Sequence, residues 1–185
     1  GPDGHPARGS FLPPVALPRR MFAGARYRYL APLPYGIEIT RTARIASVTG
    51  KQGSSGPMVF VTVANGYAAD GTLCIEEEQD IVYRAAAAPG SPPPAAPEPK
   101  PLPEAPWAET WTPDTVTLFR YSALTFNGHR IHYDRDYAKA VEGYPALVFH
   151  GPLTATLLCR FGLDRLGAAA PARFAYRGAA PLFDD

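Results

Sequence analysis

Three of the four histidines lie close together in the second half of the chain, where Asn127 is followed by His129, His132 and His150. An imidazole titrates near neutral pH, so a histidine on a turn can take a proton from a carbon acid or from water. The Asn127-Gly128 pair is typical of a turn, and the Asn127 side chain could orient a neighbouring histidine or a water molecule. This combination is typical of general acid–base chemistry.

A helix is predicted directly after His150. Apolar residues recur there at helical spacing, behind a Gly-Pro pair that favours a helix start: Leu153, Leu157, Leu158, Phe161 and Leu166. The first N–H groups of a helix have no partner within it, and the helix dipole adds partial positive charge. The N–H of Gly151 could therefore stabilise an oxyanion, such as the enolate formed when a thioester loses its α-proton.

The element expected to position these residues is a strand over Thr117–Thr125, a segment rich in β-branched and aromatic residues without a clean helical period. That strand would lead into the turn at Asn127. His129 and His132 are three residues apart and could in principle bind a metal, but no cysteine or carboxylate constellation completes a site. We therefore expect no metal and no cofactor.

Four further strands are predicted in the first half of the chain. Gly or Pro separates them, apolar and polar residues alternate within them, and they cover residues 25–33, 37–48, 58–68 and 72–83, with a hairpin loop over 51–56. Nothing in this half indicates catalysis. Residues 85–114 hold a large share of the 22 prolines and are expected to form an extended linker.

Composition limits the functional class. The chain has 185 residues, 46% of them hydrophobic, and a formal net charge of +1, which gives no electrostatic basis for binding nucleic acid. Cys74 and Cys159 lie far apart in apolar stretches and are expected to be free buried thiols. No targeting pattern or apolar run of about 18 residues is present, so we expect a cytoplasmic protein without a membrane segment.

Two strings resemble a known family. FNGHRIHYD (126–134) and YPALVFHGPLTATLL (144–158) are similar to the MaoC-like hot-dog hydratases and dehydratases. Within that family they resemble the branch of mitochondrial-type 3-hydroxyacyl-thioester dehydratases and mesaconyl-C4-CoA hydratases. The family motif Asp-x-Asn-Pro-(Leu/Ile/Val)-His places the catalytic histidine at His132. Asn127, His129 and Arg130 stand at its Asp, Asn and Pro positions, as they do in that branch.

The resemblance implies an α+β hot-dog fold, in which an antiparallel sheet wraps around one long central helix. Full-length relatives carry two such copies, and ARYRYLAPL (25–33) echoes ARFAYRGAAPL (172–182) as the same strand of each. By that resemblance, residues 1–84 are strands of the first copy, and residues 115–185 are a strand, the helix and the following strand of the second. The chain would cover part of a double hot-dog, truncated at both ends.

The expected activity is addition or removal of water across the Cα–Cβ bond of an enoyl or 3-hydroxyacyl thioester of coenzyme A or acyl carrier protein, including mesaconyl-CoA-type substrates. His132 would be the base, Gly151 the oxyanion donor, and Asn127 would position water or the hydroxyl group. Tyr121, His129 and His150 would contact the substrate, and Arg130 is a candidate for coenzyme phosphates. A homodimer is expected from the resemblance. The alternative is a catalytically silent hot-dog module that binds acyl thioesters or a partner subunit.

Overall fold

The computed structural model describes residues 1, 3–5, 9–53, 56–86 and 104–184. Contacts divide the chain into two compact units. One, the sheet unit, comprises residues 8–86 and 155–178, and the other, the histidine unit, comprises residues 1–7, 87–154 and 179–185. Each unit is described by itself below.

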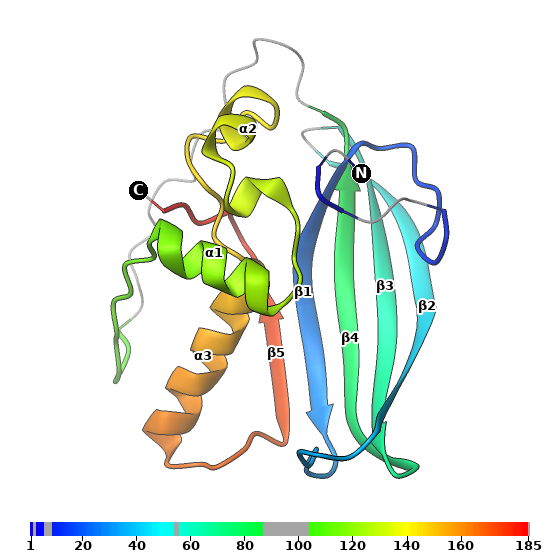
Figure 1. Ribbon diagram of the computed structural model, residues 1–185, viewed down its shortest axis with the longest axis vertical. Coiled ribbons are helices and arrows are strands. Elements are labelled where there is room, and N and C mark those ends of the chain that lie inside the picture. The colour runs from blue at the N-terminus through cyan, green and yellow to red at the C-terminus, as the bar shows by residue number, and fades with distance from the viewer. Residues whose placement is uncertain (2, 6–8, 54–55, 87–103, 185) are drawn as a thin grey trace. The chain divides into compact units, whose positions relative to one another are not determined.

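The strands of the described part of the sheet unit form one five-stranded sheet in the order β2-β3-β4-β1-β5 (Figure 1). Its strands, all antiparallel to their neighbours, are β1 (Arg19–Tyr29), β2 (Ile39–Gly53), β3 (Gly56–Ala69), β4 (Thr72–Arg84) and β5 (Arg173–Arg177). A two-residue turn joins β3 to β4, and both of its residues, Asp70 and Gly71, have positive φ. That is the backbone geometry of the turns that match the twist of a hairpin.

The core of the sheet unit follows from alternation along β3 and β4. Val61, Val63 and Tyr83 are buried, and partly buried apolar residues pack against them: Leu12, Val15, Leu17, Ile45, Val59 and Ile81. Side chains alternate between the faces of a strand, so this spacing places one apolar row on one face. Cys74 and Cys159 are both free thiols, as predicted. Cys74 is buried, but the predicted burial of Cys159 is wrong, because that side chain is half-buried.

The four strands predicted in the first half of the chain are confirmed, although β1 begins six residues before the predicted start at Ala25. Strands extend to Gly53 and resume at Gly56, so most of the predicted hairpin loop is strand, and residues 54–55 lie outside the described residues. The two echoing segments are hydrogen-bonded neighbours, because β5 pairs with β1 from Arg173↔Arg28 to Arg177↔Gly24.

The predicted strand over Thr117–Thr125 is wrong, because the segment forms helix α1 (Thr115–Leu124). The side chain of Asp114 accepts a hydrogen bond from Thr117 N at 2.7 Å and caps the helix N-terminus. Leu118 and Ser122 are the buried residues of α1, one helical turn apart. The cap and the buried face outweigh the β propensity of the β-branched and aromatic residues.

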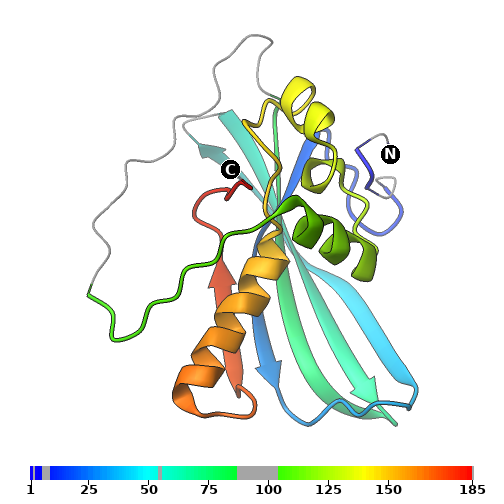
Figure 2. The ribbon, with the colours of Figure 1, turned by 60° about the vertical axis from the view of Figure 1, so that its left-hand side comes forward.

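The histidine unit continues from α1 through a 3₁₀ turn, η1 (Arg130–His132), and a short helix, α2 (Arg135–Ala140) (Figure 2). Ile131, Tyr137 and Val148 form its buried cluster, against which Tyr144 and Phe183 pack. Residues near the C-terminus add a short antiparallel connection, since Val148 bridges to Phe183 and Phe149 N donates to Leu182 O at 2.8 Å. These contacts fix the segment that leads into His150.

The helix predicted after His150 is confirmed as α3 (Gly151–Leu166). Its first four residues belong to the histidine unit and the remainder to the sheet unit. Residues 85–86 and 104–114, which fall in the predicted linker, form no helix or strand, and residues 87–103 of that linker lie outside the described residues. Over the described ranges, no helix is both long and apolar enough to cross a membrane.

Candidate active site

His132 is held by one short hydrogen bond. It ends the η1 turn, is 7% exposed, and its Nδ1 lies 2.7 Å from the carbonyl oxygen of Val148. A carbonyl can only accept, so Nδ1 carries the proton and donates it. Nε2 is therefore the lone-pair nitrogen of the neutral ring, and it makes no hydrogen bond to any described residue. The backbone thus orients His132 with its basic nitrogen free.

His150 lies next to His132 and is fully buried. Its Nε2 lies 2.9 Å from Ser122 Oγ on α1, and its buried Nδ1 has no hydrogen-bond partner among the described residues. The rings of His132 and His150 stack with centroids 3.7 Å apart and planes 18° apart.

Burial sets the protonation state of this pair. Desolvation lowers the pKa of His132 to about 4, against an opposing contribution from its hydrogen bond to Val148. Desolvation also lowers the pKa of His150 to about 3, and repulsion from His132 adds to that effect. Both rings are therefore neutral at pH 7, and His132 Nε2 keeps its lone pair.

Other rings extend the pair. Tyr121 meets His150 edge-on with centroids 4.8 Å apart, and His129 meets His132 edge-on at 5.4 Å. His5, which was not a predicted site residue, places its ring 4.0 Å from that of His129. The structure thus brings the predicted Tyr121, His129, His132 and His150 into one connected group of rings.

Asn127 shapes the loop before His129. Its Oδ1 accepts a hydrogen bond from the backbone N–H of His129 at 3.1 Å, and the preceding residue, Phe126, has a positive φ of 52°. This is the local side-chain-to-backbone bond by which an Asn stabilises a turn. The Oδ1 atom of Asn127 is therefore engaged in holding the turn that presents His129.

Gly151 opens α3 with an unpaired backbone donor. Thr154 N donates to the carbonyl of His150 at 3.0 Å, while the N–H of Gly151 has no acceptor among the described residues. A helix start of this kind combines free N–H groups with the positive end of the helix dipole. The helix start predicted at Gly151 therefore lies directly after the buried His150, with its N–H available to a ligand.

Arg130 has partners within its own turn. Its guanidinium pairs with Asp134, with Nη2 2.7 Å and Nε 3.0 Å from Oδ2, and lies over the ring of Tyr137 at 4.1 Å. A phosphate would have to compete with these contacts or add to them.

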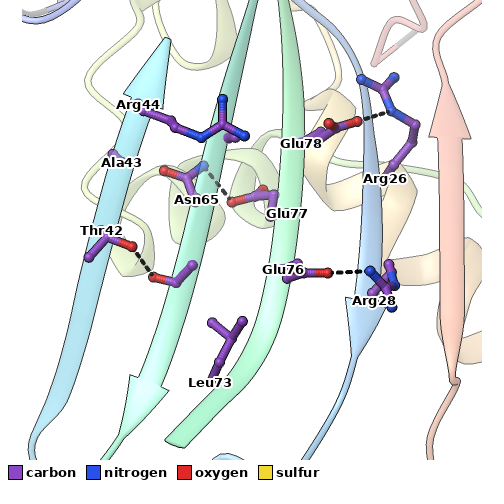
Figure 3. Close-up of a pocket in the computed structure, with 12 residues that line it drawn as sticks. Arg26, Arg28, Thr42, Ala43, Arg44, Asn65, Leu73, Glu76, Glu77 and Glu78 are labelled. Atoms are coloured by element: carbon purple, nitrogen blue, oxygen red, sulfur yellow. Dashed lines mark hydrogen bonds and ion pairs between the residues drawn. The ribbon is translucent and has the colours of Figure 1, made fainter. Parts of the chain in front are cut away.

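A separate hollow of about 550 Å³ lies on the sheet (Figure 3). Charged pairs line much of it, including Arg26–Glu78 at 2.9 Å and Arg28–Glu76 at 2.7 Å. None of the histidines lines it. Exposed pairs of this kind contribute little to stability. Because its lining includes no histidine, this hollow is not the candidate active site.

Two groups that hold the site, the hydroxyl of Ser122 and the carbonyl of Val148, are not predicted from the sequence. Ser122 escapes notice because the residue types of its segment favour a strand. Placed on a helix, it lies one turn after the apolar Leu118 and shares its buried face. A backbone carbonyl such as that of Val148 leaves no signal in the sequence.

Comparisons with known proteins identify relatives. The family model described as hydroxyacyl-thioester dehydratase type 2 matches residues 1–184. A mesaconyl-C(4)-CoA hydratase from Chloroflexus aurantiacus is 55% identical over 185 residues, which cover 98% of this chain and 64% of that protein. A mitochondrial hydroxyacyl-thioester dehydratase type 2 from Schizosaccharomyces pombe is 38% identical over 89 residues, covering 48% of this chain and 28% of that protein. The chain thus spans less than two thirds of either relative.

Solved structures resemble the fold at low sequence identity. A MaoC-like dehydratase superposes with a TM-score of 0.71 at 19% identity, covering 91% of this chain and 62% of that one. The peroxisomal multifunctional enzyme type 2 of Drosophila melanogaster gives a TM-score of 0.68 at 16% identity, covering 88% of this chain and 30% of that one. The expected α+β hot-dog fold is confirmed.

Proposed function

We propose that this chain, which belongs to the hydroxyacyl-thioester dehydratase type 2 family, is a hydro-lyase acting on acyl thioesters. It adds water across the Cα–Cβ double bond of an enoyl thioester, or removes water from the 3-hydroxyacyl thioester. The observation that carries this proposal is the fixed tautomer of His132, whose Nδ1–H donates to Val148 at 2.7 Å and leaves Nε2 as a free base.

The dehydration step needs one base and one oxyanion donor. His132 Nε2 takes the α-proton, and the electrons of the Cα–H bond move onto the thioester carbonyl, whose oxygen accepts a hydrogen bond from Gly151 N–H. The enolate then forms the Cα–Cβ double bond as the β C–O bond breaks. The leaving hydroxyl takes the proton from the His132 imidazolium and departs as water. Hydration is the reverse, and neither direction requires a metal or a cofactor.

The remaining site residues are proposed to position the water and to contact the substrate. Asn127 holds the turn before His129, and its amide nitrogen is the group proposed to position the water or hydroxyl, because its Oδ1 is bonded to His129 N. Tyr121 and His129 border the stacked pair and are proposed to contact the acyl group. Arg130 is proposed for the coenzyme phosphates, with its contacts to Asp134 and Tyr137 holding the guanidinium in place.

Coenzyme A thioesters are the proposed substrates, with mesaconyl-C(4)-CoA first, because a mesaconyl-C(4)-CoA hydratase is the 55% identical relative. The test is to follow the loss of enoyl-thioester absorbance when the chain is mixed with mesaconyl-C(4)-CoA or crotonyl-CoA. Turnover of either substrate supports the hydro-lyase, and their ratio reports acyl preference. A folded chain that turns over neither contradicts the proposal.

One observation favours the second candidate, a hot-dog module that binds acyl thioesters without turnover. The family motif has an acidic residue where this chain has Asn127, whose side chain cannot ionise and whose Oδ1 is bonded to His129 N. Calorimetric titration with butyryl-CoA, a saturated thioester to which water cannot add, separates the two candidates. Binding of butyryl-CoA without turnover of any enoyl thioester identifies the silent module.

A further inference from the structure

The contact between Ser122 and His150 bears on both the position and the tautomer of the His150 ring. Ser122 Oγ and His150 Nε2 are 2.9 Å apart, and the two residues are 6% and 0% exposed. His150 Nδ1 is buried without a hydrogen-bond partner among the described residues. A buried polar atom without a partner costs free energy and calls for an explanation, such as a ligand that completes it.

Counting protons decides the tautomer of His150. If Nε2 carried the proton and donated it to Ser122, the buried hydroxyl hydrogen and the Nδ1 lone pair would both lack partners. If the Ser122 hydroxyl donates to Nε2 instead, the Nδ1–H is the one polar hydrogen of the pair left without a partner. The second arrangement leaves fewer buried groups unsatisfied and is therefore the stable one.

We propose that Ser122 holds His150 as its Nδ1–H tautomer, so that this N–H donates to the thioester carbonyl oxygen of the bound substrate beside the N–H of Gly151. This inference rests on the proposed function and deepens it. His150 would be a catalytic residue and Ser122 a positioning residue that acts through it. The oxyanion would then have two neutral donors from consecutive residues, one a side chain and one the backbone.

The stack explains why the second donor should be a neutral ring. When His132 takes the α-proton it becomes an imidazolium, and the ring of His150 lies 3.7 Å away, face to face with it. A second imidazolium at that distance would be strongly repelled. A neutral His150 does not repel the imidazolium of His132 and can still donate one hydrogen bond.

Nitrogen-15 NMR of the histidine-labelled full chain tests the tautomer directly, because a protonated ring nitrogen and a lone-pair nitrogen have well separated chemical shifts. The expected result is a protonated Nδ1 and a lone-pair Nε2 for His150. On addition of butyryl-CoA the Nδ1 signal should shift. In Ser122→Ala, the fraction of the Nδ1–H tautomer and the shift caused by butyryl-CoA should both be smaller. A protonated Nε2, or an Nδ1 signal that butyryl-CoA leaves unchanged, overturns the inference, whether or not the chain is an active hydratase.

Kinetics with a matched pair of variants test the donation. Asn places its amide nitrogen near the position of Nδ1 and Gln places its own near Nε2, so His150→Asn should hydrate crotonyl-CoA about 10-fold faster than His150→Gln. Ser122→Ala should lower kcat about 10- to 100-fold with little change in KM, and Ser122→Thr, which retains the hydroxyl, should recover most of the loss.

Ser47→Ala is the control for Ser122→Ala, since Ser47 is exposed on β2 and far from the histidines in sequence. Thermal unfolding of each variant checks that it is folded. If the wild-type chain is active and His150→Asn is no faster than His150→Gln, the inference is wrong while the proposed function stands. If the wild-type chain is inactive while the NMR result holds, the proposed hydratase activity fails and the donor assignment stands.

Discussion

Acid should unfold the histidine unit through His132 and His150. Their pKa values are lowered from 6.5 to about 4 and about 3 in the folded state by burial, so below pH 6.5 the unfolded chain binds protons that the folded chain does not. The free energy of unfolding is nearly constant above pH 6.5 and decreases progressively as the pH falls towards the folded pKa values. Acidification therefore destabilises the folded state.

The magnitude follows from the two shifts. Lowering the pH from about 7.5 to about 5 should decrease the free energy of unfolding by about 2 kcal/mol for each histidine, and by about 4 kcal/mol for the two together. Each unit of pKa difference between the folded and unfolded states is worth about 1.4 kcal/mol. Urea unfolding at a series of pH values, with fluorescence and circular dichroism as probes, measures this loss.

Variants separate the two histidines from other acid effects. His150→Asn and His132→Asn should each lower stability at neutral pH, since both side chains are buried, yet each should remove about half of the loss between pH 7.5 and 5, or about 2 kcal/mol. The double variant should show almost no loss over that interval. Equal pH dependence in the wild type and all three variants would refute the reasoning that burial holds these rings neutral.

Three further outcomes are expected. Leu118→Ala in α1 should lower the free energy of unfolding by about 2–5 kcal/mol because Leu118 is fully buried, whereas Leu124→Ala, at an 81% exposed position of the same helix, should change it by less than about 0.5 kcal/mol in denaturant titrations. Gly71→Ala should cost about 1 kcal/mol because φ is +77° there, while Gly50→Ala, where φ is not positive and the space is open, should cost less in the same assay. The value of kcat/KM should stay flat from about pH 8 to about pH 5.5, because His132, the proposed base, has a pKa of about 4, and a fall centred near pH 6.5 would contradict that pKa.

Much of the fold was predictable because its signals are local. Alternation along β3 and β4 and the leucine spacing of α3 each act within one element, and all three elements form where expected. The nature of α1 was not predictable from propensity, since its β-branched and aromatic residues are outweighed by the Asp114 cap and by the burial of Leu118. The pairing of β5 with β1 joins segments more than 140 residues apart, which no local spacing rule can foresee.

The residue types of the candidate site were predictable, but the groups that orient them were not. His132, His150 and Gly151 are recognisable because imidazoles and a helix start are chemically distinctive residue patterns. The groups that orient them, the carbonyl of Val148 and the hydroxyl of Ser122, lie 16 and 28 residues away from their partners. Only the folded chain brings such groups within hydrogen-bond distance.

The most direct test of the central claim is hydration of crotonyl-CoA in D₂O by the wild-type chain and by His132→Ala, with Ser47→Ala as the control. The wild type and the control should convert crotonyl-CoA to the 3-hydroxyacyl thioester with one deuterium at Cα. His132→Ala should lower that rate by at least about 100-fold while remaining folded and still binding butyryl-CoA. A His132→Ala chain that incorporates deuterium at the wild-type rate would show that His132 is not the base.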